Sequence, residues 1–431
     1  MNIIKYPEKA KWKSLLARPS IDVESLISSV SEIIDEVKKG GDKALYELTR
    51  KFDKVELDSI AVSSVELAAA KFEIDDQLKA SIDLAKSNIE FFHNKQVPGR
   101  ISCETNPGVR VWQEAKPIEK VGLYIPGGTA PLLSTVLMLG IPAKIAGCSE
   151  VVLCTPPSKE GKVDSAILYT ASLLGINKIF KLGGAQAIAA MAYGTESVPA
   201  VYKIFGPGNQ YVTAAKLKVS LDNIAIDMPA GPSEVAVIAD NSSNPAYVAS
   251  DLLSQAEHGI DSQVLLVTKD SEIIEKIQFE LDKQLSDLPR KEMAKKSLDN
   301  SRFILLKTDE EILDLINTYA PEHLIIVTEN YSELVKEVRN AGSVFLGPYT
   351  PESAGDYASG TNHTLPTNGT ARAYSGVNID SFMKKITYQE ITRYGLFNLG
   401  PAIERMAKAE DLEAHSRAVS IRMNAANNYR S

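Results

Sequence analysis

The sequence predicts an α/β protein with two units built on parallel sheets, a helical lead-in and a helical C-terminal tail. Short apolar runs alternate with helical segments between residues 120 and 347, a pattern typical of parallel strands joined by crossover helices. The 431 residues also exceed the roughly 250–300 residues at which a single core usually stops growing. We therefore expect two Rossmann-like units.

The first part of the chain is predicted to be helical. After a short N-terminal arm, residues 1–20, the segment VESLISSVSEIIDEVKKGG has apolar residues at helical spacing and ends in glycines. The segment DDQLKASIDLAKSNIEFF repeats this spacing after an acidic start. Residues 21–97 would thus form the helical lead-in.

Two series of strands are predicted after the lead-in. The first comprises VGLYI, VVLCT, KIFKLG, AVYKIF and NIAIDM, and the second comprises EVAVIAD, QVLLVT, RFILL, HLIIV and SVFLG. Pro and Gly in MPAGPSE, residues 228–234, mark the boundary between the two. We assign residues 123–233 to one α/β domain, residues 21–122 with 234–377 to the other, and residues 378–431 to a helical tail without strands.

Composition limits the possible partners. A net charge of −8 argues against a nucleic-acid ligand and favours a small-molecule substrate. The N-terminus lacks the apolar core of a signal peptide, and the most apolar stretch, residues 130–147, is interrupted by Gly140, Pro142 and Lys144. We expect a cytoplasmic protein that does not enter a membrane.

The cysteines indicate neither a disulfide framework nor a thiolate metal site. Cys103, Cys148 and Cys154 are odd in number and do not form a CxxC pair. We expect them to be small buried apolar residues.

Three glycine-rich turns follow strands of the first series, in LYIPGGTAP (123–131), KLGGAQA (181–187) and FGPGNQYV (205–212). None is a complete G-x-G-x-x-G, so each could simply be a tight turn between a strand and a helix. Together, however, they would meet at the carboxyl edge of one sheet, where free N–H groups at helix N-termini suit a pyrophosphate or a carboxylate.

Four of the five histidines lie in polar strings that also contain a carboxylate or a carboxamide: SQAEHG, APEHLI, GDYASGTNHT and AEDLEAH. This pairing suggests a metal site beside an acid/base group. Gln255 and His258 would share one helix face, although such a pair is more often a solvated surface. Glu322 and His323 precede a strand and suit proton transfer, with strand-edge solubility as the alternative.

The other two strings are less specific. Asp356 and His363 lie in a Gly-, Ser- and Thr-rich stretch that could bring metal ligands together or could be a polar surface loop. Glu410 and His415 are five positions apart in the tail, so they do not share a helix stripe. His415 contributes to a site only if the tail folds against a cleft.

Seven strings in this order resemble the histidinol dehydrogenase family: VGLYIPGGTAPL, GPGNQYV, DMPAGPSEV, SQAEHG, APEHL, GDYASGTNHTLPT and EDLEAHSRAV. The resemblance extends from about residue 20 to the C-terminus. It implies the final step of histidine biosynthesis, in which L-histidinol is oxidised through L-histidinaldehyde to L-histidine with two successive reductions of NAD. It also implies one zinc ion per active site.

The resemblance further implies roles for individual residues. The expected zinc ligands are Gln255, His258, Asp356 and His415, and the expected proton-transfer pair is Glu322 and His323. Further substrate contacts are expected from Ser233, His363 and Glu410, in addition to the zinc ligands and His323. The expected NAD contacts are Tyr124, Gln186 and Asn209.

The family is homodimeric, so the resemblance implies a tail that reaches the partner subunit and supplies His415 and Glu410 to its site. From the residues alone, two other functional classes stay open: a zinc hydrolase, and a two-domain sensor of a nucleotide or metabolite. Imidazole and oxygen ligands do not distinguish zinc from manganese or cobalt.

Overall fold

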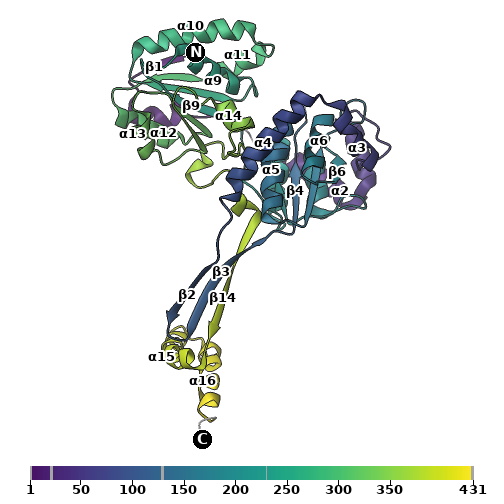
Figure 1. Cartoon of the computed structure of the whole chain (residues 1–431), viewed down its shortest axis with the longest axis vertical. Helices are drawn as coiled ribbons and strands as arrows, with labels where there is room; N and C mark the ends of the chain where they lie inside the picture. The colour runs from purple at the N-terminus through teal and green to yellow at the C-terminus, as the bar shows by residue number, and fades with distance from the viewer. Residues whose placement is uncertain (1, 20–22, 128–130, 230, 429–431) are drawn as a thin grey trace. The chain divides into compact units, whose positions relative to one another are not determined.

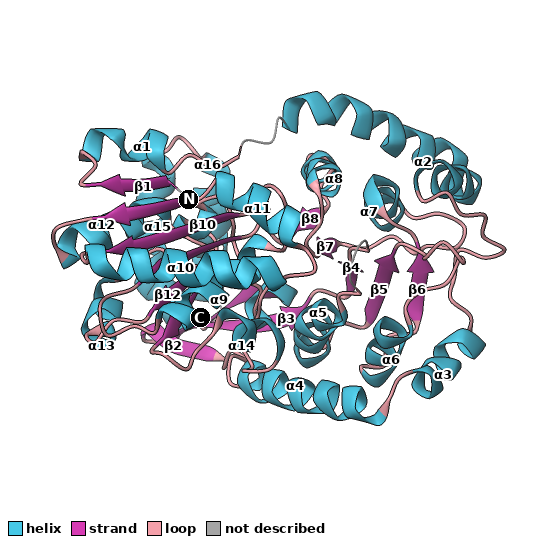
Figure 2. Cartoon of the chain, turned by 90° about the horizontal axis from the view of Figure 1, so that it is seen from above, coloured by secondary structure: helices cyan, strands magenta, loops and turns pink. Residues whose placement is uncertain are grey.

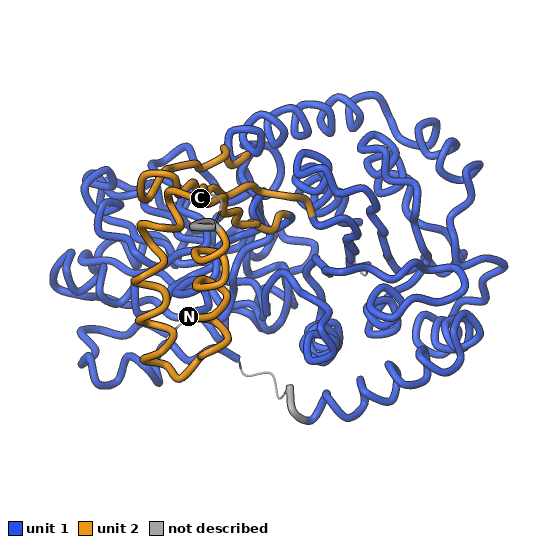
Figure 3. The backbone as a smooth tube through the Cα atoms, turned by 90° about the horizontal axis from the view of Figure 1, so that it is seen from below, with its two compact units in different colours: residues 1–96, 118–382 blue, residues 97–117, 383–431 orange. Residues whose placement is uncertain are grey.

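The computed structural model describes residues 2–19, 23–127, 131–229 and 231–428. The chain divides into two compact units (Figure 3): Met1–Gln96 with Ile118–Phe382, and Val97–Pro117 with Met383–Ser431. Each unit is described below by itself.

The first unit contains a five-stranded parallel sheet with the order β6-β5-β4-β7-β8. Its strands are β4 (Lys120–Tyr124), β5 (Glu150–Thr155), β6 (Lys178–Lys181), β7 (Lys203–Phe205) and β8 (Ala225–Ile226). The order runs outward in both directions from β4, so it reverses between β4 and β7. Open α/β sheets bind ligands at such a switch point.

Helices cover both faces of this sheet (Figures 1 and 2). The crossover helices are α5 (Leu133–Ala146), α6 (Ser165–Leu173), α7 (Gly184–Tyr193) and α8 (Gln210–Ser220). An outer layer follows on each side: α2 (Val23–Phe52) packs on α7 and α8, while α3 (Ser64–Glu73) packs on α6 and α4 (Asp76–Asn94) on α5.

The position of the lead-in helices differs from the sequence-based assignment, which joined residues 21–122 to the domain of residues 234–377. Val30, Ile34 and Leu45 of α2 are fully buried in one core with Ile188 of α7 and Val212 of α8. The apolar stripe of an amphipathic helix predicts that the helix is covered, but it does not specify which sheet covers it.

A six-stranded parallel sheet follows, with the order β1-β11-β10-β9-β12-β13. Its strands are β1 (Asn2–Lys5), β9 (Glu234–Ile238), β10 (Gln263–Thr268), β11 (Arg302–Leu305), β12 (His323–Ile326) and β13 (Ser343–Leu346). Apart from β1, which the N-terminal arm adds at one edge beside β11, the strand order repeats that of the first sheet. Its switch point lies between β9 and β12.

Each face of this sheet packs against helices. Val235 and Val237 face a core formed with α9 (Pro245–Ala256), α10 (Ser271–Asp287) and α11 (Lys291–Asp299). Ala236 and Ile238 point to the opposite core, formed with α12 (Asp309–Tyr319), α13 (Tyr331–Leu334) and the arm helix α1 (Trp12–Leu15). Because both faces are covered, the strands are continuous apolar runs. Helix α14 (Glu352–Tyr357) follows β13, and short 3-10 turns occupy Lys9–Lys11, Val335–Glu337, Thr370–Arg372 and Ile379–Phe382.

The second unit is an antiparallel sheet joined to two helices. Strands β14 (Met383–Ile391), β3 (Val109–Pro117) and β2 (Ile101–Asn106) pair in that order. Trp112 stacks on Tyr388 with the ring centroids 5.2 Å apart. Helices α15 (Arg393–Ala409) and α16 (Glu413–Asn428) pack together, with Met423 and Val419 against Gly400.

The fold class is thus confirmed: the protein is α/β, with two parallel-sheet units, N-terminal helices and a helical C-terminal region. The expectation that no strand follows residue 378 is wrong, because β14 pairs with β3. All of β2 and most of β14 are solvent-exposed, so these strands lack the apolar run that marks a buried strand. Within the described part of the chain, no helix is both long and apolar enough to cross a membrane.

Candidate functional site

A polar cluster lies at the amino edge of the six-stranded sheet, at its switch point. Glu234 opens β9 and His323 opens the neighbouring strand β12, with His323 in register with Val235. Before β12, helix α12 ends at Ala320, which has a left-handed backbone with φ 52°. Pro321 then restricts the chain, so Glu322 and His323 enter the sheet in a fixed direction.

Three carboxylates surround the buried imidazole of His323. Its Nδ1 lies 3.7 Å from Oε2 of Glu322 and 3.5 Å from Oε1 of Glu352, and its Nε2 lies 3.6 Å from Oδ1 of Asp356. Nε2 is buried and has no hydrogen-bond partner among the described residues. A buried nitrogen of this kind is a candidate ligand atom or proton-transfer atom.

The predicted residues of SQAEHG and GDYASGTNHT lie in the same region as this imidazole. Gln255 is fully buried at the end of α9. Its amide lies against Glu352 and has two orientations: in one, its nitrogen donates to Oε2 of Glu352 at 3.2 Å and its oxygen accepts from the Glu234 N–H at 3.3 Å, and in the other, its oxygen faces the carboxylate, as a metal ligand would. His258 is exposed in the turn after α9, and its imidazole interacts electrostatically with the Asp356 carboxylate. The ring Nδ1 of His363 lies 3.0 Å from the carbonyl oxygen of Asp356. Ser233 is half-buried and directly precedes β9.

Glu352 and Glu234 are the site residues that the sequence did not reveal. Glu352 lies four positions before Asp356 in the same short helix, a spacing that places both carboxylates on one face. That spacing was the available signal. Glu234 carried none, because a glutamate at the start of an apolar run is usually solvated.

Burial and like charges dominate the electrostatics. Burial raises the pKa of both Glu322 and Glu352 to about 8. Burial alone would lower the pKa of His323, but the surrounding Glu352, Glu322 and Asp356 raise it to about 10. Without another cation, the imidazolium is therefore the positive charge that compensates these acids.

The donor set fits a divalent metal ion. One ligand atom each of His323, Glu352 and Asp356 lies within 4.8 Å of the others, and the nearby Gln255 and His258 offer an amide oxygen and an imidazole. Nitrogen and oxygen donors of this kind suit zinc, and also manganese or cobalt. Asp356 belongs both to this triad and to the ligand set that the family resemblance implies.

Two expected site residues lie in the second unit. Glu410 follows the last turn of α15, and His415 lies in the first turn of α16. Both side chains are exposed. Within their own unit, neither residue meets a second metal-ligand cluster among the described residues.

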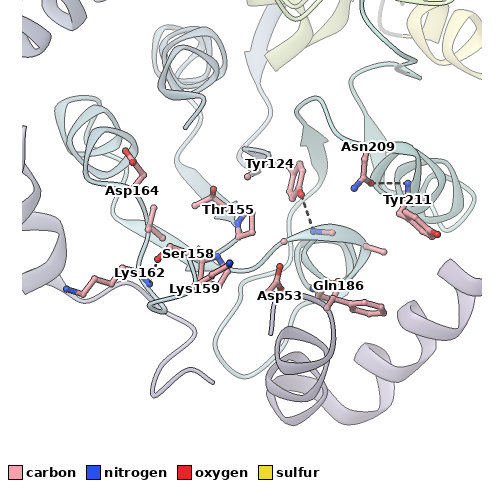
Figure 4. A pocket seen from close by; sticks show the side chains of 18 of the residues that line it. Asp53, Tyr124, Thr155, Ser158, Lys159, Lys162, Asp164, Gln186, Asn209 and Tyr211 are labelled. Atoms are coloured by element: carbon pink, nitrogen blue, oxygen red, sulfur yellow. Dashed lines mark hydrogen bonds between the residues drawn. The ribbon is translucent and has the colours of Figure 1, made fainter. Parts of the chain in front are cut away.

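A separate cavity of about 1280 Å³ lies at the carboxyl edge of the five-stranded sheet, and Tyr124, Gln186 and Asn209 all line it (Figure 4). Tyr124 ends β4, and its hydroxyl accepts from the Gly184 N–H at 3.0 Å. Asn209 caps α8, since its Oδ1 accepts from the N–H groups of Tyr211 and Val212 at 3.0 and 3.1 Å. Residues 128–130 of the first glycine-rich turn lie outside the described residues.

The glycine-rich turn after β7, which leads to Asn209 in the cavity wall, is held in place by several contacts. Gly206 follows β7 with φ 127°, and a Cβ at this position would collide with the Tyr124 backbone. The Gly206 N–H donates to Asp227 at 2.8 Å, and the Gly206 carbonyl accepts from Lys216 at 2.9 Å. Lys216 and Asp227 also form a buried ion pair. The G-P-G-N turn is therefore held rigidly where it meets the cavity.

Comparisons with known proteins agree with the family resemblance. The sequence model of the histidinol dehydrogenase family matches residues 16–423. Histidinol dehydrogenase of Bacteroides thetaiotaomicron is 61% identical over 98% of this chain and 99% of the relative, and that of Yersinia pestis is 52% identical over 96% and 94%. The crystal structure of histidinol dehydrogenase from Elizabethkingia anophelis superimposes with a TM-score of 0.97 at 54% identity, covering 99% of both chains.

Asp53 follows the last residue of α2 and lines the cavity, and its burial leads to a testable prediction about stability. Its Oδ2 is buried without a hydrogen-bond partner among the described residues, and burial raises its pKa to about 6 from 3.8. Between about pH 4 and pH 6 the folded protein therefore holds a proton that the unfolded chain has released. The stability that this proton provides is present below pH 4 and is lost as the pH rises through 6, so the ionised carboxylate lowers the free energy of unfolding at pH 7. We predict that Asp53→Asn raises the free energy of unfolding at pH 7 by clearly less than about 3 kcal/mol, the equivalent of the full pKa shift, because the side chain is partly exposed and water screens its charge.

The measurement is urea unfolding at pH 4 and pH 7. The gain should disappear at pH 4, where Asp53 is protonated in the folded state. Asp58→Asn, at an exposed position on the same segment, should change stability at neither pH. An equal effect of both substitutions, or a gain that persists at pH 4, would contradict the assignment.

Proposed function

The chain belongs to the histidinol dehydrogenase family and is an oxidoreductase of histidine biosynthesis, and we propose that it oxidises L-histidinol through L-histidinaldehyde to L-histidine in the cytoplasm, using zinc and NAD. The main support is the buried pairing of Glu322 with His323 beside potential metal ligands. A cavity lined by the three expected NAD contacts adds to it.

His323 is proposed to take the proton of the alcohol in the first step. Its Nε2 is buried and has no hydrogen-bond partner among the described residues, and its Nδ1 lies 3.3 Å from the carbonyl oxygen of Glu234. A neutral ring with its proton on Nδ1 can donate to this carbonyl, so Nε2 is left as the base. A bound zinc ion would hold the amino alcohol in place and add positive charge among the carboxylates. His323 could then be neutral.

Glu322 is proposed to activate the water that attacks the aldehyde in the second step. Its Oε2 accepts from the Glu234 N–H at 3.0 Å, which fixes the carboxylate beside the imidazole. A carboxylate in a dry site, close to its partner base, is a suitable general base. Ser233, His363 and Glu410 are proposed to contact the substrate together with the metal ligands.

The acceptor of both hydrides is proposed to be NAD bound in the cavity of the five-stranded sheet. The N-termini of α7 and α8 open onto this cavity through Gly184 and Asn209. The partial positive charge of a helix N-terminus suits a pyrophosphate. The Gly184, Tyr211 and Val212 N–H groups are already bonded to Tyr124 and Asn209, and the turns do not form a complete dinucleotide fingerprint.

No cysteine is proposed to form a covalent intermediate. Cys154 is fully buried, and burial raises its pKa far above that of a reactive thiol; burial also raises the pKa of Cys148 to about 12. Cys103 is exposed in β2 of the second unit and Cys148 is half-buried, so the expectation that all three are buried holds only for Cys154. The raised thiol pKa values make Cys148 and Cys154 poor nucleophiles, so the water route is favoured over a thiohemiacetal.

The proposal is tested by following NAD reduction with L-histidinol, before and after a chelator removes the metal. We expect two NADH per histidine, loss of activity with loss of metal, and recovery when zinc is added. A zinc hydrolase would release product without NAD, and a sensor would bind ligand without turnover. Metal analysis of the purified protein gives a second readout, with one zinc expected per chain.

Glu322→Gln should separate the two steps. The carboxamide has the shape of the carboxylate but cannot accept the proton of water, so aldehyde oxidation should fall by roughly 10²- to 10⁴-fold. Histidinol affinity and metal content should be unchanged, and histidinaldehyde should accumulate. Normal oxidation of added histidinaldehyde by this variant would remove Glu322 from its proposed role.

His415→Asn tests the proposed homodimer, in which the tail supplies His415 and Glu410 to the partner's site. This substitution should lower zinc affinity, measured by competition with a chelator. Mixed with Glu322→Gln subunits, it should regain activity, since one site of each heterodimer would have every group intact. Failure to regain activity despite demonstrated subunit exchange would argue that each site is formed within one chain.

A further inference from the structure

Arg18 of the N-terminal arm contacts Glu234 at the edge of the polar cluster. Its guanidinium binds both carboxylate oxygens of Glu234, with Nη2 donating to Oε1 at 2.8 Å and Nε paired with Oε2. The Arg18 side chain is 14% exposed and that of Glu234 is 2% exposed. A bidentate pair between Arg and a carboxylate is the strongest and most directional form of this interaction.

Further contacts hold Arg18 in place. The same Nη2 donates to the carbonyl of Tyr319 at 2.8 Å, and the guanidinium lies 3.9 Å from the centroid of the Tyr319 ring. The Tyr319 hydroxyl donates to Gln263 at 2.9 Å, and the Gln263 amide donates in turn to the carbonyl of Ala17 at 3.2 Å. The arm is thus fastened to the strand edge at both Ala17 and Arg18.

Glu234 connects Arg18 to Glu322 through a reciprocal pair of hydrogen bonds. The Glu322 N–H donates to Oε1 of Glu234 at 3.3 Å, and the Glu234 N–H donates to Oε2 of Glu322 at 3.0 Å. Each glutamate side chain therefore fixes the backbone of the other. The Glu234 carboxylate is buried, and Arg18 binds both of its oxygens, so Arg18 fixes the orientation of the side chain that holds the Glu322 backbone.

We propose that Arg18 is a positioning residue that acts through Glu234 to hold Glu322 where it can activate water. This inference rests on the proposed function, and it extends the active site to a segment more than 200 residues away in sequence. Without Arg18, the Glu234 carboxylate would lose the partner that fixes its orientation and would turn away. The reciprocal pair would then be lost, and aldehyde oxidation would slow more than alcohol oxidation.

The test compares Arg18→Ala with the wild-type enzyme, saturated with zinc, in two assays: NAD reduction with histidinol under aldehyde trapping, and NAD reduction with histidinaldehyde. We expect the second rate to fall by roughly 10- to 100-fold more than the first. The dissociation constant of histidinol, measured by calorimetry, and the zinc content should stay within about twofold of wild type.

Glu234→Gln supplies a rescue. A carboxamide at residue 234 needs no cation, yet its oxygen can still accept from the Glu322 N–H. The double variant Arg18→Ala/Glu234→Gln should therefore oxidise histidinaldehyde faster than Arg18→Ala alone. Lys9→Ala is the matched control, because it removes another ion pair of the arm, with Asp314, that is exposed and far from Glu234 in the chain; both rates should be unchanged.

Three results would overturn the inference: equal rates of Arg18→Ala and wild type in both assays, equal losses in both steps together with weaker histidinol binding, or no rescue by Glu234→Gln. If Arg18→Ala does not fold, Arg18→Lys, which keeps the charge but loses the fork, must still slow the aldehyde step selectively. A wild-type enzyme inactive in both assays would instead reject the proposed function, and this inference with it.

Discussion

Acidic groups packed around one imidazole set the main constraint on this structure. Glu322, Glu352 and Asp356 all lie within 4 Å of His323, and Glu234 adjoins Glu322. In a dry site such acids cannot all be ionised unless cations compensate them. The structure provides that compensation in two ways: Arg18 binds Glu234, and His323 carries a proton among the other three. A divalent ion is a third means, and the donor atoms are arranged to accept one.

The two parallel sheets share one strand order but use opposite edges. In the five-stranded sheet, the cavity opens where β4 and β7 end, the usual position for a ligand at a switch point. In the six-stranded sheet, the polar cluster lies where β9 and β12 begin. Glu234 and His323 are the first residues of those strands, and Gln255 comes from the end of α9, which runs back toward that edge. The left-handed turn at Ala320 and the following proline direct Glu322 into the cluster.

The sequence predicted the parts of the fold that are fully buried. Strands covered on both faces are continuous apolar runs, so both parallel sheets could be recognised. The exposed strands β2 and β14 have no such run and were missed. The lead-in helices were assigned to the wrong sheet, because an apolar stripe predicts that a helix is covered but not which sheet covers it. Histidine pairing indicated the polar cluster, and glycine turns indicated the cavity edge. Individual roles came from the family resemblance. The spacing of Glu352 from Asp356 was a signal that went unused, whereas Glu234 and Arg18 gave no recognisable signal, since their importance arises only from burial.

The two protein cations in the cluster differ in how permanently they hold their charge. Arg18 cannot lose its proton in a protein, and its fork is fixed by Tyr319 and by the anchored arm, so Glu234 keeps a constant partner. His323 is charged only while the neighbouring acids lack another cation. Binding of a metal ion would therefore be coupled to proton release from the cluster, as is general for sites whose ligands titrate. Arg18, which is always charged, orients Glu322 through Glu234. His323 can give up its proton when another cation is present, so its imidazole can act as a base. The fold assigns these two requirements to separate residues, which is why a segment as remote as the N-terminal arm belongs to the site.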